Sequence, residues 1–227
     1  MTFSIVAKCR QSEQYGIAIT SSSICVASRC PWVRSGVGAV STQNITLPSL
    51  GPALLDKMAQ EKSTDEAMHE VMGNEVNADY RQVIAVDNQG RTSGFNGSKS
   101  LGINNISQGK NCIAAGNLLS AIEVTEVMID EFLAADKTRL ADRLLDAMDA
   151  GLKAGGEAGP VHSAGLLVVG ENSWPLIDLR VDWTDNNPLA ELRYLWDRYA
   201  PQMDDYISRA INPSSAPAYG VPGEGQR

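Results

Sequence analysis

Apolar residues in the first forty positions fall into short, nearly continuous runs that are typical of β-strands. The runs at residues 3–9 and 15–20 are separated by polar residues 11–14, a pattern that predicts a β-hairpin. A third run, residues 36–42, predicts another strand. Because these runs are apolar on both faces of a strand, we expect a sheet that is covered on both sides.

Helical periodicity alternates with further hairpins along the rest of the chain. Ser63 and Glu66 form a capping box at the start of one predicted helix, and the pair Gly155-Gly156 is expected to end another. The other predicted helices cover about residues 51–62, 122–135, 138–154 and 188–211, the last with a kink at Pro201. The remaining predicted strands are 81–87, 91–96, 111–115, 164–169 and 176–182.

The order of these elements predicts the fold class. Groups of strands joined as hairpins are followed by groups of helices, which favours antiparallel sheets layered with helices in one α+β domain. We expect this domain to span residues 1–211. Residues 212–227 are rich in Pro, Gly and Ser, and we expect them to form a flexible C-terminal tail.

Charge and composition narrow the class of protein. The 227 residues include 19 Lys and Arg against 27 Asp and Glu, a net charge of −8, which argues against nucleic acid as a partner. No apolar window is long enough to cross a membrane, and Lys8 follows the first apolar run, the wrong order for a signal peptide. The cysteines lack a CxxC spacing, so we expect reduced, buried thiols and a cytoplasmic protein: Cys9, Cys25, Cys30 and Cys112.

Several familiar kinds of site are excluded by their missing motifs. The chain has no P-loop, no dinucleotide fingerprint and no GxSxG nucleophile elbow. Two histidines far apart in sequence do not predict a His-rich zinc site, and no metal or other cofactor is expected. His69 lies on the polar side of a helix, where an exposed surface position is expected. His162 comes just before a predicted strand and is a candidate for lining a cleft.

A candidate nucleophile stands at the second position of the chain. A small residue after Met1 permits removal of that Met, and Thr2 would then carry both a hydroxyl and a free α-amine. Such an amine has a pKa of about 7.7–8.0, which suits a general base at neutral pH. The predicted hairpin returns residues 20–23 to Thr2, so Ser21 and Ser22 could bind the amine or a substrate. While Met1 stays attached, the Thr2 nitrogen is an amide and cannot act as a base.

Longer segments of the chain resemble a known bacterial family. They are residues 2–7, 16–19, 31–43, 115–119, 163–169, 178–182 and 191–193. Together they resemble domain of unknown function 1028, a family assigned to the N-terminal nucleophile (Ntn) hydrolase superfamily. The resemblance covers residues 2–211 and implies a four-layer αββα sandwich of two antiparallel sheets flanked by helices. It also implies amide-bond hydrolysis by the N-terminal residue and, by analogy, a homo-oligomer of two or more copies.

The resemblance further suggests roles for individual residues. Thr2 would be the nucleophile, and Arg34 would supply a supporting positive charge, unless Arg34 is only a surface charge at the start of a strand. Backbone amides near Gln43 and Asn44 would form an oxyanion hole. The further candidates for substrate or oxyanion contacts are Ser21, Ser22, Asn117, His162 and Asp182. For Asp182, a structural salt-bridge ladder with Arg180 is the alternative.

Two functions remain open from the sequence. The first is an amidohydrolase that cleaves the C–N bond of a small amide, ureido or acylamino substrate through Thr2. The second is a non-catalytic small-molecule-binding or assembly protein on the same fold. Retention of Met1, and serines at residues 21–23 where relatives often carry a lysine, would favour the second. Phosphate-ester chemistry has no supporting motif.

Overall fold

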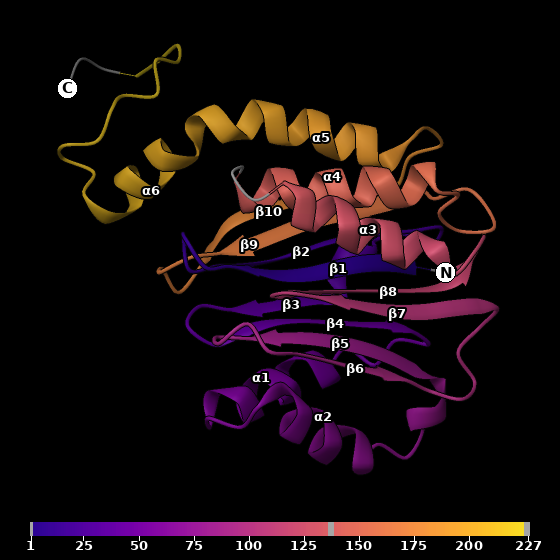
Figure 1. The fold of residues 1–227 in the computed structure, drawn as a ribbon. Helices are drawn as coiled ribbons and strands as arrows, with labels where there is room; N and C mark the ends of the chain where they lie inside the picture. The colour runs from indigo at the N-terminus through magenta and orange to yellow at the C-terminus, as the bar shows by residue number, and fades with distance from the viewer. Residues whose placement is uncertain (1, 136–138, 225–227) are drawn as a thin grey trace.

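Two antiparallel β-sheets lie face to face in the middle of the molecule (Figure 1). The structure is a computed structural model, and it describes residues 2–135 and 139–224. The larger sheet has six strands in the spatial order β10 (Pro175–Val181), β9 (Ser163–Val169), β2 (Gln14–Ser21), β1 (Thr2–Cys9), β8 (Cys112–Leu119) and β7 (Ile103–Gly109). The smaller sheet has four, in the order β3 (Pro31–Arg34), β4 (Gly38–Asn44), β5 (Arg81–Asp87) and β6 (Thr92–Asn96).

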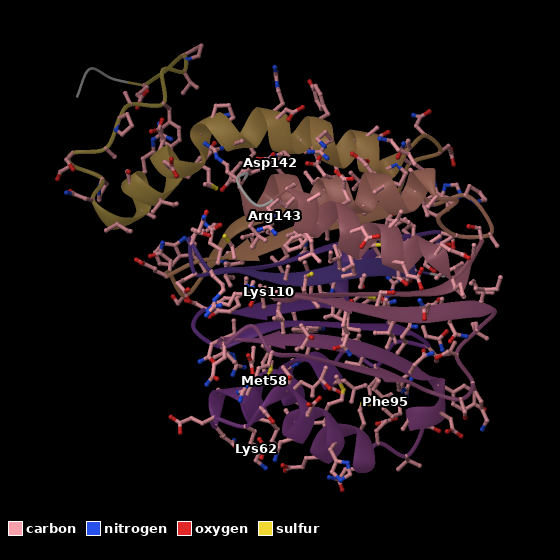
Figure 2. All side chains as sticks on the ribbon, viewed as in Figure 1. Met58, Lys62, Phe95, Lys110, Asp142 and Arg143 are labelled. Carbon is pink, nitrogen blue, oxygen red and sulfur yellow. The ribbon has the colours of Figure 1, made fainter. Side chains whose placement is uncertain are left out.

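Helices cover the outer face of each sheet, so the chain forms four layers (Figure 1). The smaller sheet is covered by α1 (Leu50–Ala59) and α2 (Thr64–Gly73). Met58 and Phe95 lie between that sheet and its helices (Figure 2). The larger sheet is covered by α3 (Glu123–Ala134), α4 (Leu140–Lys153), α5 (Pro188–Tyr199) and α6 (Met203–Ile211). The predicted α+β sandwich of two antiparallel sheets flanked by helices is confirmed.

The central strands are buried on both faces, as their apolar runs predict. Every residue of β1 is buried. On its outer face Phe3 and Ile5 pack with α3 and α4, and on its inner face Val6 packs with Ile84 of the smaller sheet. Side chains alternate along a strand, so Thr2 and Ser4 lie on the same inner face as Val6. The candidate nucleophile therefore faces the space between the two sheets.

Most predicted ends of helices and strands lie within a few residues of the ends in the structure. The capping box forms, because Ser63 Oγ accepts from the Glu66 amide and the Glu66 carboxylate accepts from the Ser63 amide. The long C-terminal helix is interrupted by a 3₁₀ turn at Ala200–Gln202, which contains Pro201, in agreement with the predicted kink. Thr138, the first residue of another predicted helix, lies outside the described residues, and so do residues 225–227 of the predicted tail.

Two strands, β3 and β7, were not predicted, and both lie at a sheet edge. β3 has four residues and begins at Pro31, a residue that cannot donate a ladder hydrogen bond and is confined to edges. β7 reads INNISQG and is only partly buried, so its sequence carries no apolar period. The third predicted strand begins at Gly38 rather than Gly36, because residues 35–37 form the turn between β3 and β4.

The remaining expectations concern thiols and membranes. All four cysteines are free, and three of them are buried, whereas Cys25 is half-buried. Among the residues that the structure describes, none of the helices combines the length and apolar character that a membrane span requires.

Candidate functional site

Thr2 is held at the start of the central strand β1. It pairs with Asn117 of β8 on one side, while its neighbour Phe3 pairs with Thr20 of β2 on the other. Thr2 is 5% exposed, and its Oγ1 donates a hydrogen bond to Ser21 Oγ at 3.2 Å. The hairpin therefore brings the serine segment, residues 21–23, to Thr2, as the sequence predicts.

Three buried side-chain amides near Thr2 form a hydrogen-bond network in which the donor and acceptor atoms can be assigned. Gln82 of β5 donates through Nε2 to the Gly116 carbonyl oxygen at 2.9 Å, and a carbonyl can only accept. This contact sets the orientation of the Gln82 amide group. Gln82 Oε1 then accepts from Gln43 Nε2 at 2.7 Å and from Asn117 Nδ2 at 3.1 Å. The orientations of all three side-chain amides follow from one backbone carbonyl.

Asn117 consequently presents an open acceptor beside Thr2. Its Nδ2 is engaged by Gln82, and its Oδ1 is fully buried without a hydrogen-bond partner. Residues directly opposite on antiparallel strands carry side chains on the same face, with Cβ atoms about 5 Å apart. An open carbonyl oxygen at this position can accept an N–H from a bound molecule.

The two residues that the sequence proposes for an oxyanion hole differ in their surroundings. Gln43 belongs to the buried network, since its Oε1 accepts from Ser4 Oγ at 2.7 Å. Asn44 ends β4 with a left-handed backbone, φ 70°. Its side chain donates to the Tyr80 carbonyl and accepts from the Leu101 amide. The Gln43 side chain therefore lies under Thr2, whereas the Asn44 side chain fastens neighbouring loops.

Glu157 lies across the start of β1, a position that the sequence did not single out. Its backbone forms an antiparallel bridge with Leu119 at the end of β8, and its Oε1 accepts from the Ser22 amide at 3.2 Å. Glu157 is 5% exposed, and its Oε2 has no hydrogen-bond partner. Burial raises the pKa of this carboxyl to about 7, and the positive charge of the N-terminus, followed by the Ser22 hydrogen bond, offsets that rise only in part.

The turn that follows α4 delivers Glu157 to this place. The Gly155 and Gly156 amides donate back to Leu152 and Gly151, which ends the helix as the sequence predicts. Gly155 has φ +117°, and a Cβ there would approach Ser120 Oγ to 2.3 Å, so only glycine fits. Two backbone bonds, Ser120 amide to Gly156 carbonyl and Ala158 amide to Leu118 carbonyl, then fix the segment beside β8.

His162 lies on the other side of the serine segment. Its backbone amide donates to the Ser21 carbonyl at 2.8 Å. Its Nδ1 lies 2.8 Å from the Thr184 carbonyl oxygen, so Nδ1 carries the proton and Nε2 is the acceptor in the neutral ring. The ring stacks on Trp183 at 4.3 Å between centroids, and Trp183 is half exposed. His162 and Trp183 thus form an aromatic rim near Ser22.

Asp182 and Arg34 are not brought into this cluster. Asp182 is exposed, and its backbone carbonyl accepts from the Cys25 amide. Arg180 pairs with Asp178 at 2.7 Å, on the exposed side of β10. Arg34 pairs with Gly38 at the start of β4 and binds Asp56 at 2.8 Å, whereas Thr2 lies near the end of β4. The unpredicted strand β3 carries Arg34 to the far end of the sandwich, so the supporting positive charge expected there is not placed at Thr2.

A cavity of about 390 Å³ lies at the other end of β1. Its lining includes Cys9, Ser12, Leu140, Trp196 and Met203. At about 3.3 Å per residue, the eight residues of β1 separate Cys9 from Thr2 by about 23 Å. In the described part of the chain, no group of three or more His, Cys, Asp or Glu side chains could hold a metal ion.

The residues that sequence reasoning missed share one property. Glu157, Gln82 and Ser4 come from three distant segments and meet only through the sheets. Glu157 reads as a loop residue in the run Gly-Gly-Glu-Ala-Gly-Pro, and Gln82 as one polar residue in an apolar strand. A polar side chain inside a strand buried on both faces was the one signal that could have identified Gln82.

A family profile matches nearly the whole chain. The profile of a family of unknown function, DUF1028, matches residues 2–192. The chain belongs to this family. The match confirms the resemblance found in the sequence motifs, and the family's description assigns it no activity.

Solved structures provide a second comparison. The crystal structure of protein SPO2555 from Silicibacter pomeroyi, of the same DUF1028 family, is similar with a TM-score of 0.80 and 27% sequence identity over 88% of this chain and 89% of that chain. Anbu (ancestral beta-subunit) from Yersinia bercovieri aligns over 90% of this chain and 97% of that chain, with 12% identity and a TM-score of 0.39, too distant to support an argument. No curated protein matches the sequence.

Proposed function

We propose that this DUF1028 protein is an Ntn-type amidohydrolase that cleaves a small amide-type C–N bond with Thr2 after removal of Met1. The observation that carries the proposal is the setting of Thr2. A hydroxyl residue at the start of a central buried strand is hydrogen-bonded to Ser21 and has two open buried acceptors around it, Asn117 Oδ1 and Glu157 Oε2. Unpartnered buried polar atoms are rare in stable folds and call for an explanation.

The reaction proceeds in two balanced halves. In the first, Thr2 Oγ1 attacks the substrate carbonyl carbon and its proton passes to the α-amine of Thr2. The C–N bond then breaks, the proton moves to the leaving nitrogen, and the acyl group remains as an ester on Thr2. In the second, water attacks the ester, gives a proton to the same amine, and releases a carboxylic acid while the proton returns to Oγ1. The sum is amide plus water to acid plus amine.

The remaining candidates take roles that follow from their open atoms. Asn117 Oδ1 accepts an N–H of the substrate, since its Nδ2 is held by Gln82. Ser21 orients the Thr2 hydroxyl. Backbone amides near Gln43 are the proposed oxyanion donors, and His162 and Ser22 are proposed to contact the substrate. Because Thr2 is 5% exposed, we propose a small molecule rather than a folded protein as the substrate.

Acylation of the N-terminus tests the proposal. The chain that begins at Thr2, made by co-expressing a methionine aminopeptidase and checked by intact mass, is treated with a β-lactone that acylates nucleophilic hydroxyls. We expect one adduct, located at Thr2 by peptide mass spectrometry. Thr2→Ser should keep the adduct, whereas Thr2→Ala and the chain that retains Met1 should lose it.

Steady-state kinetics measure how much of the activity depends on Thr2. With any amide substrate found by screening, Thr2→Ala should reduce kcat/KM by at least about 10³-fold while its thermal unfolding stays that of the wild type. Cys9→Ala, at the other end of the same strand, is the matched control and should leave turnover unchanged. Full turnover by Thr2→Ala would overturn the proposal.

The cavity at the Cys9 end favours the second candidate function, a non-catalytic binding protein. Its volume of about 390 Å³ suits a small ligand. Under this alternative, a ligand from a metabolite screen would raise the melting temperature of the wild type and of Thr2→Ala equally. Cavity variants such as Ser12→Trp would abolish the shift. Ligand stabilisation that disappears in Thr2→Ala would instead support the amidohydrolase.

A further inference from the structure

Glu157 is a buried carboxylate whose hydrogen-bonding capacity is mostly unused. An ionised carboxylate has two oxygens with about four acceptor sites. Oε1 accepts one bond, from the Ser22 amide at 3.2 Å, and Oε2 has no partner although the residue is 5% exposed. Burying a charged group without partners is costly, so a structural role for this side chain alone does not account for a carboxylate at this position.

The strand register places this open oxygen at the start of β1. Phe3 pairs with Thr20 on β2, and Thr2 reaches Ser21 through its hydroxyl. Ser22, which holds Glu157 Oε1, is therefore one step beyond Thr2 along β2. On the other side Thr2 pairs with Asn117, and Leu119, which bridges to Glu157, is two steps beyond along β8. Glu157 therefore joins the chain segments that follow β2 and end β8, just beyond the N-terminal end of β1 where Thr2 lies.

We propose that Glu157 is the positioning residue for the α-amine of Thr2: once Met1 is removed, its free carboxylate oxygen accepts a hydrogen bond from that amine and holds it next to the Thr2 hydroxyl. An ammonium group has donors and no acceptor, and Glu157 Oε2 is an acceptor without a donor, so each supplies what the other lacks. The inference rests on the proposed function for its catalytic meaning.

The pair also accounts for the proton during the reaction. When Thr2 Oγ1 loses its proton to the amine, the resulting ammonium lies beside a carboxylate that stabilises it, until the proton passes to the leaving nitrogen. No bond forms at Glu157, which acts through the amine. An opposite charge within about 4–6 Å shifts a pKa by 1–3 units in favour of the charged form. The carboxylate should therefore raise the pKa of the Thr2 amine.

A titration without any substrate tests the inference. In the chain that begins at Thr2, ¹³C-labelled at threonine, the Thr2 Cα and Cβ shifts report the amine. We expect its apparent pKa to be higher in the wild type than in Glu157→Gln by about one pH unit or more. Glutamine keeps the shape and the Ser22 hydrogen bond but removes the charge.

Two controls isolate the effect of this carboxylate. Glu171→Gln makes the same charge change at an exposed site beyond the other end of β9 and should titrate like the wild type. The charge of His162 also acts on Glu157, so His162→Gln is included, and the difference between Glu157 and its glutamine variant should persist in that background. Identical Thr2 midpoints in the wild type and Glu157→Gln would overturn the inference.

A second readout needs no variant. Two groups that share a proton titrate as a pair, so the side-chain carboxyl carbon of Glu157 should show the same two midpoints as the Thr2 carbons. Independent single midpoints would contradict the proposal even if Glu157→Gln failed to fold.

The kinetic consequence separates this inference from the proposed function. If amides are hydrolysed, Glu157→Gln should lower kcat by up to about tenfold on the alkaline plateau of the pH profile, where the amine is deprotonated in both proteins; this is the rate equivalent of one pKa unit. It should also move the acid limb of the pH profile to lower pH, because the amine loses its proton more readily without the carboxylate. An active wild type with an unchanged profile in Glu157→Gln defeats only this inference. A chain that hydrolyses no amide while its Thr2 titration still depends on Glu157 defeats only the proposed function.

Discussion

Each end of the sheet sandwich contains a buried carboxylate, and the two carboxylates differ in how many hydrogen bonds they accept. At the end of β5, Asp87 is 1% exposed and accepts from the Gln89 amide, the Arg91 amide and Arg91 Nε, all within 2.9 Å. At the start of β1, Glu157 is 5% exposed and accepts one hydrogen bond. Both residues are buried, so burial does not distinguish them. They differ in the number of hydrogen bonds that their carboxylate oxygens accept.

The neighbouring side chains follow the same division. Near Asp87, the buried Lys8 ammonium binds Glu13 at 2.6 Å and the Asn88 carbonyl at 2.5 Å, so its charge is neutralised. Lys110 and Arg143 lie at this same end (Figure 2), where they line a cavity with Lys8. At the Thr2 end, Asn117 Oδ1 and Glu157 Oε2 are left open. The bonded groups at the Asp87 end stabilise the fold, whereas the open acceptors at the Thr2 end agree with the proposal that this end binds another group.

The largest expected difference in stability comes from the amide network. Gln82→Met keeps the side-chain length but leaves the buried Gln43 Nε2 and Asn117 Nδ2 without their acceptor, and it removes the side-chain donor to the Gly116 carbonyl. Each buried group left unbonded costs about 1–3 kcal/mol. We therefore expect the free energy of unfolding, measured by urea denaturation, to fall by about 4 kcal/mol.

A substitution to methionine at the Asp87 end of the sandwich, which also keeps the side-chain length, is the control for this prediction. Lys8→Met removes a charge whose partner, Glu13, is 62% exposed and can return to water. We expect a loss of about 1 kcal/mol. Equal losses in the two variants would show that the ends do not differ as described.

The next effect concerns the pH dependence of stability. In the chain that retains Met1, burial raises the pKa of Glu157 from its ordinary value of 4.5 to about 7. The folded state binds this proton more tightly than the unfolded state does. The contribution of Glu157 to the free energy of unfolding is therefore fully present below about pH 4.5 and is lost as the pH rises through about 7. The loss amounts to about 3 kcal/mol. Urea midpoints between pH 4 and 8 should show it.

Comparison of variants assigns this slope to one residue. Glu157→Gln should flatten the slope and Glu171→Gln should leave it. In the chain that begins at Thr2, the ammonium partner should reduce the slope as well. A slope that survives in Glu157→Gln would assign the titration to another group.

The smallest effect is expected for Arg34. Its bond to Asp56 joins side chains that are 41% and 60% exposed, and such surface pairs contribute about 0–1 kcal/mol. Arg34→Ala should therefore change the free energy of unfolding by less than about 1 kcal/mol, with Thr2 acylation unaffected. Slower acylation in Arg34→Ala would return Arg34 to the site.

Much of the architecture was accessible from local patterns. The hairpin of β1 and β2, the capping box at Ser63 and the glycine stop after α4 each depend on residues close in sequence, and each is present. The edge strands β3 and β7 were missed because an edge strand needs neither an apolar face nor a full ladder. The family resemblance suggested Arg34 as a supporting charge, and the unpredicted strand β3 pairs it with Gly38, at the end of β4 away from Thr2.

The sequence by itself determined that Thr2 begins a buried strand and that serines lie next to it, because a hairpin pairs residues of two strands joined by one short turn. It also determined the family, since the motifs span nearly the whole chain. Asn117 was already a candidate from the family resemblance, but only the tertiary structure decided that it pairs with Thr2 and that Gln82 and Glu157 lie beside it. Gln82, Asn117 and Glu157 come from β5, β8 and the turn after α4, and their side chains are oriented by one carbonyl, at Gly116, and one amide, at Ser22. Hydrogen bonds between distant segments have no period in the sequence, because they depend on the register of strands that pair only when the sheets assemble.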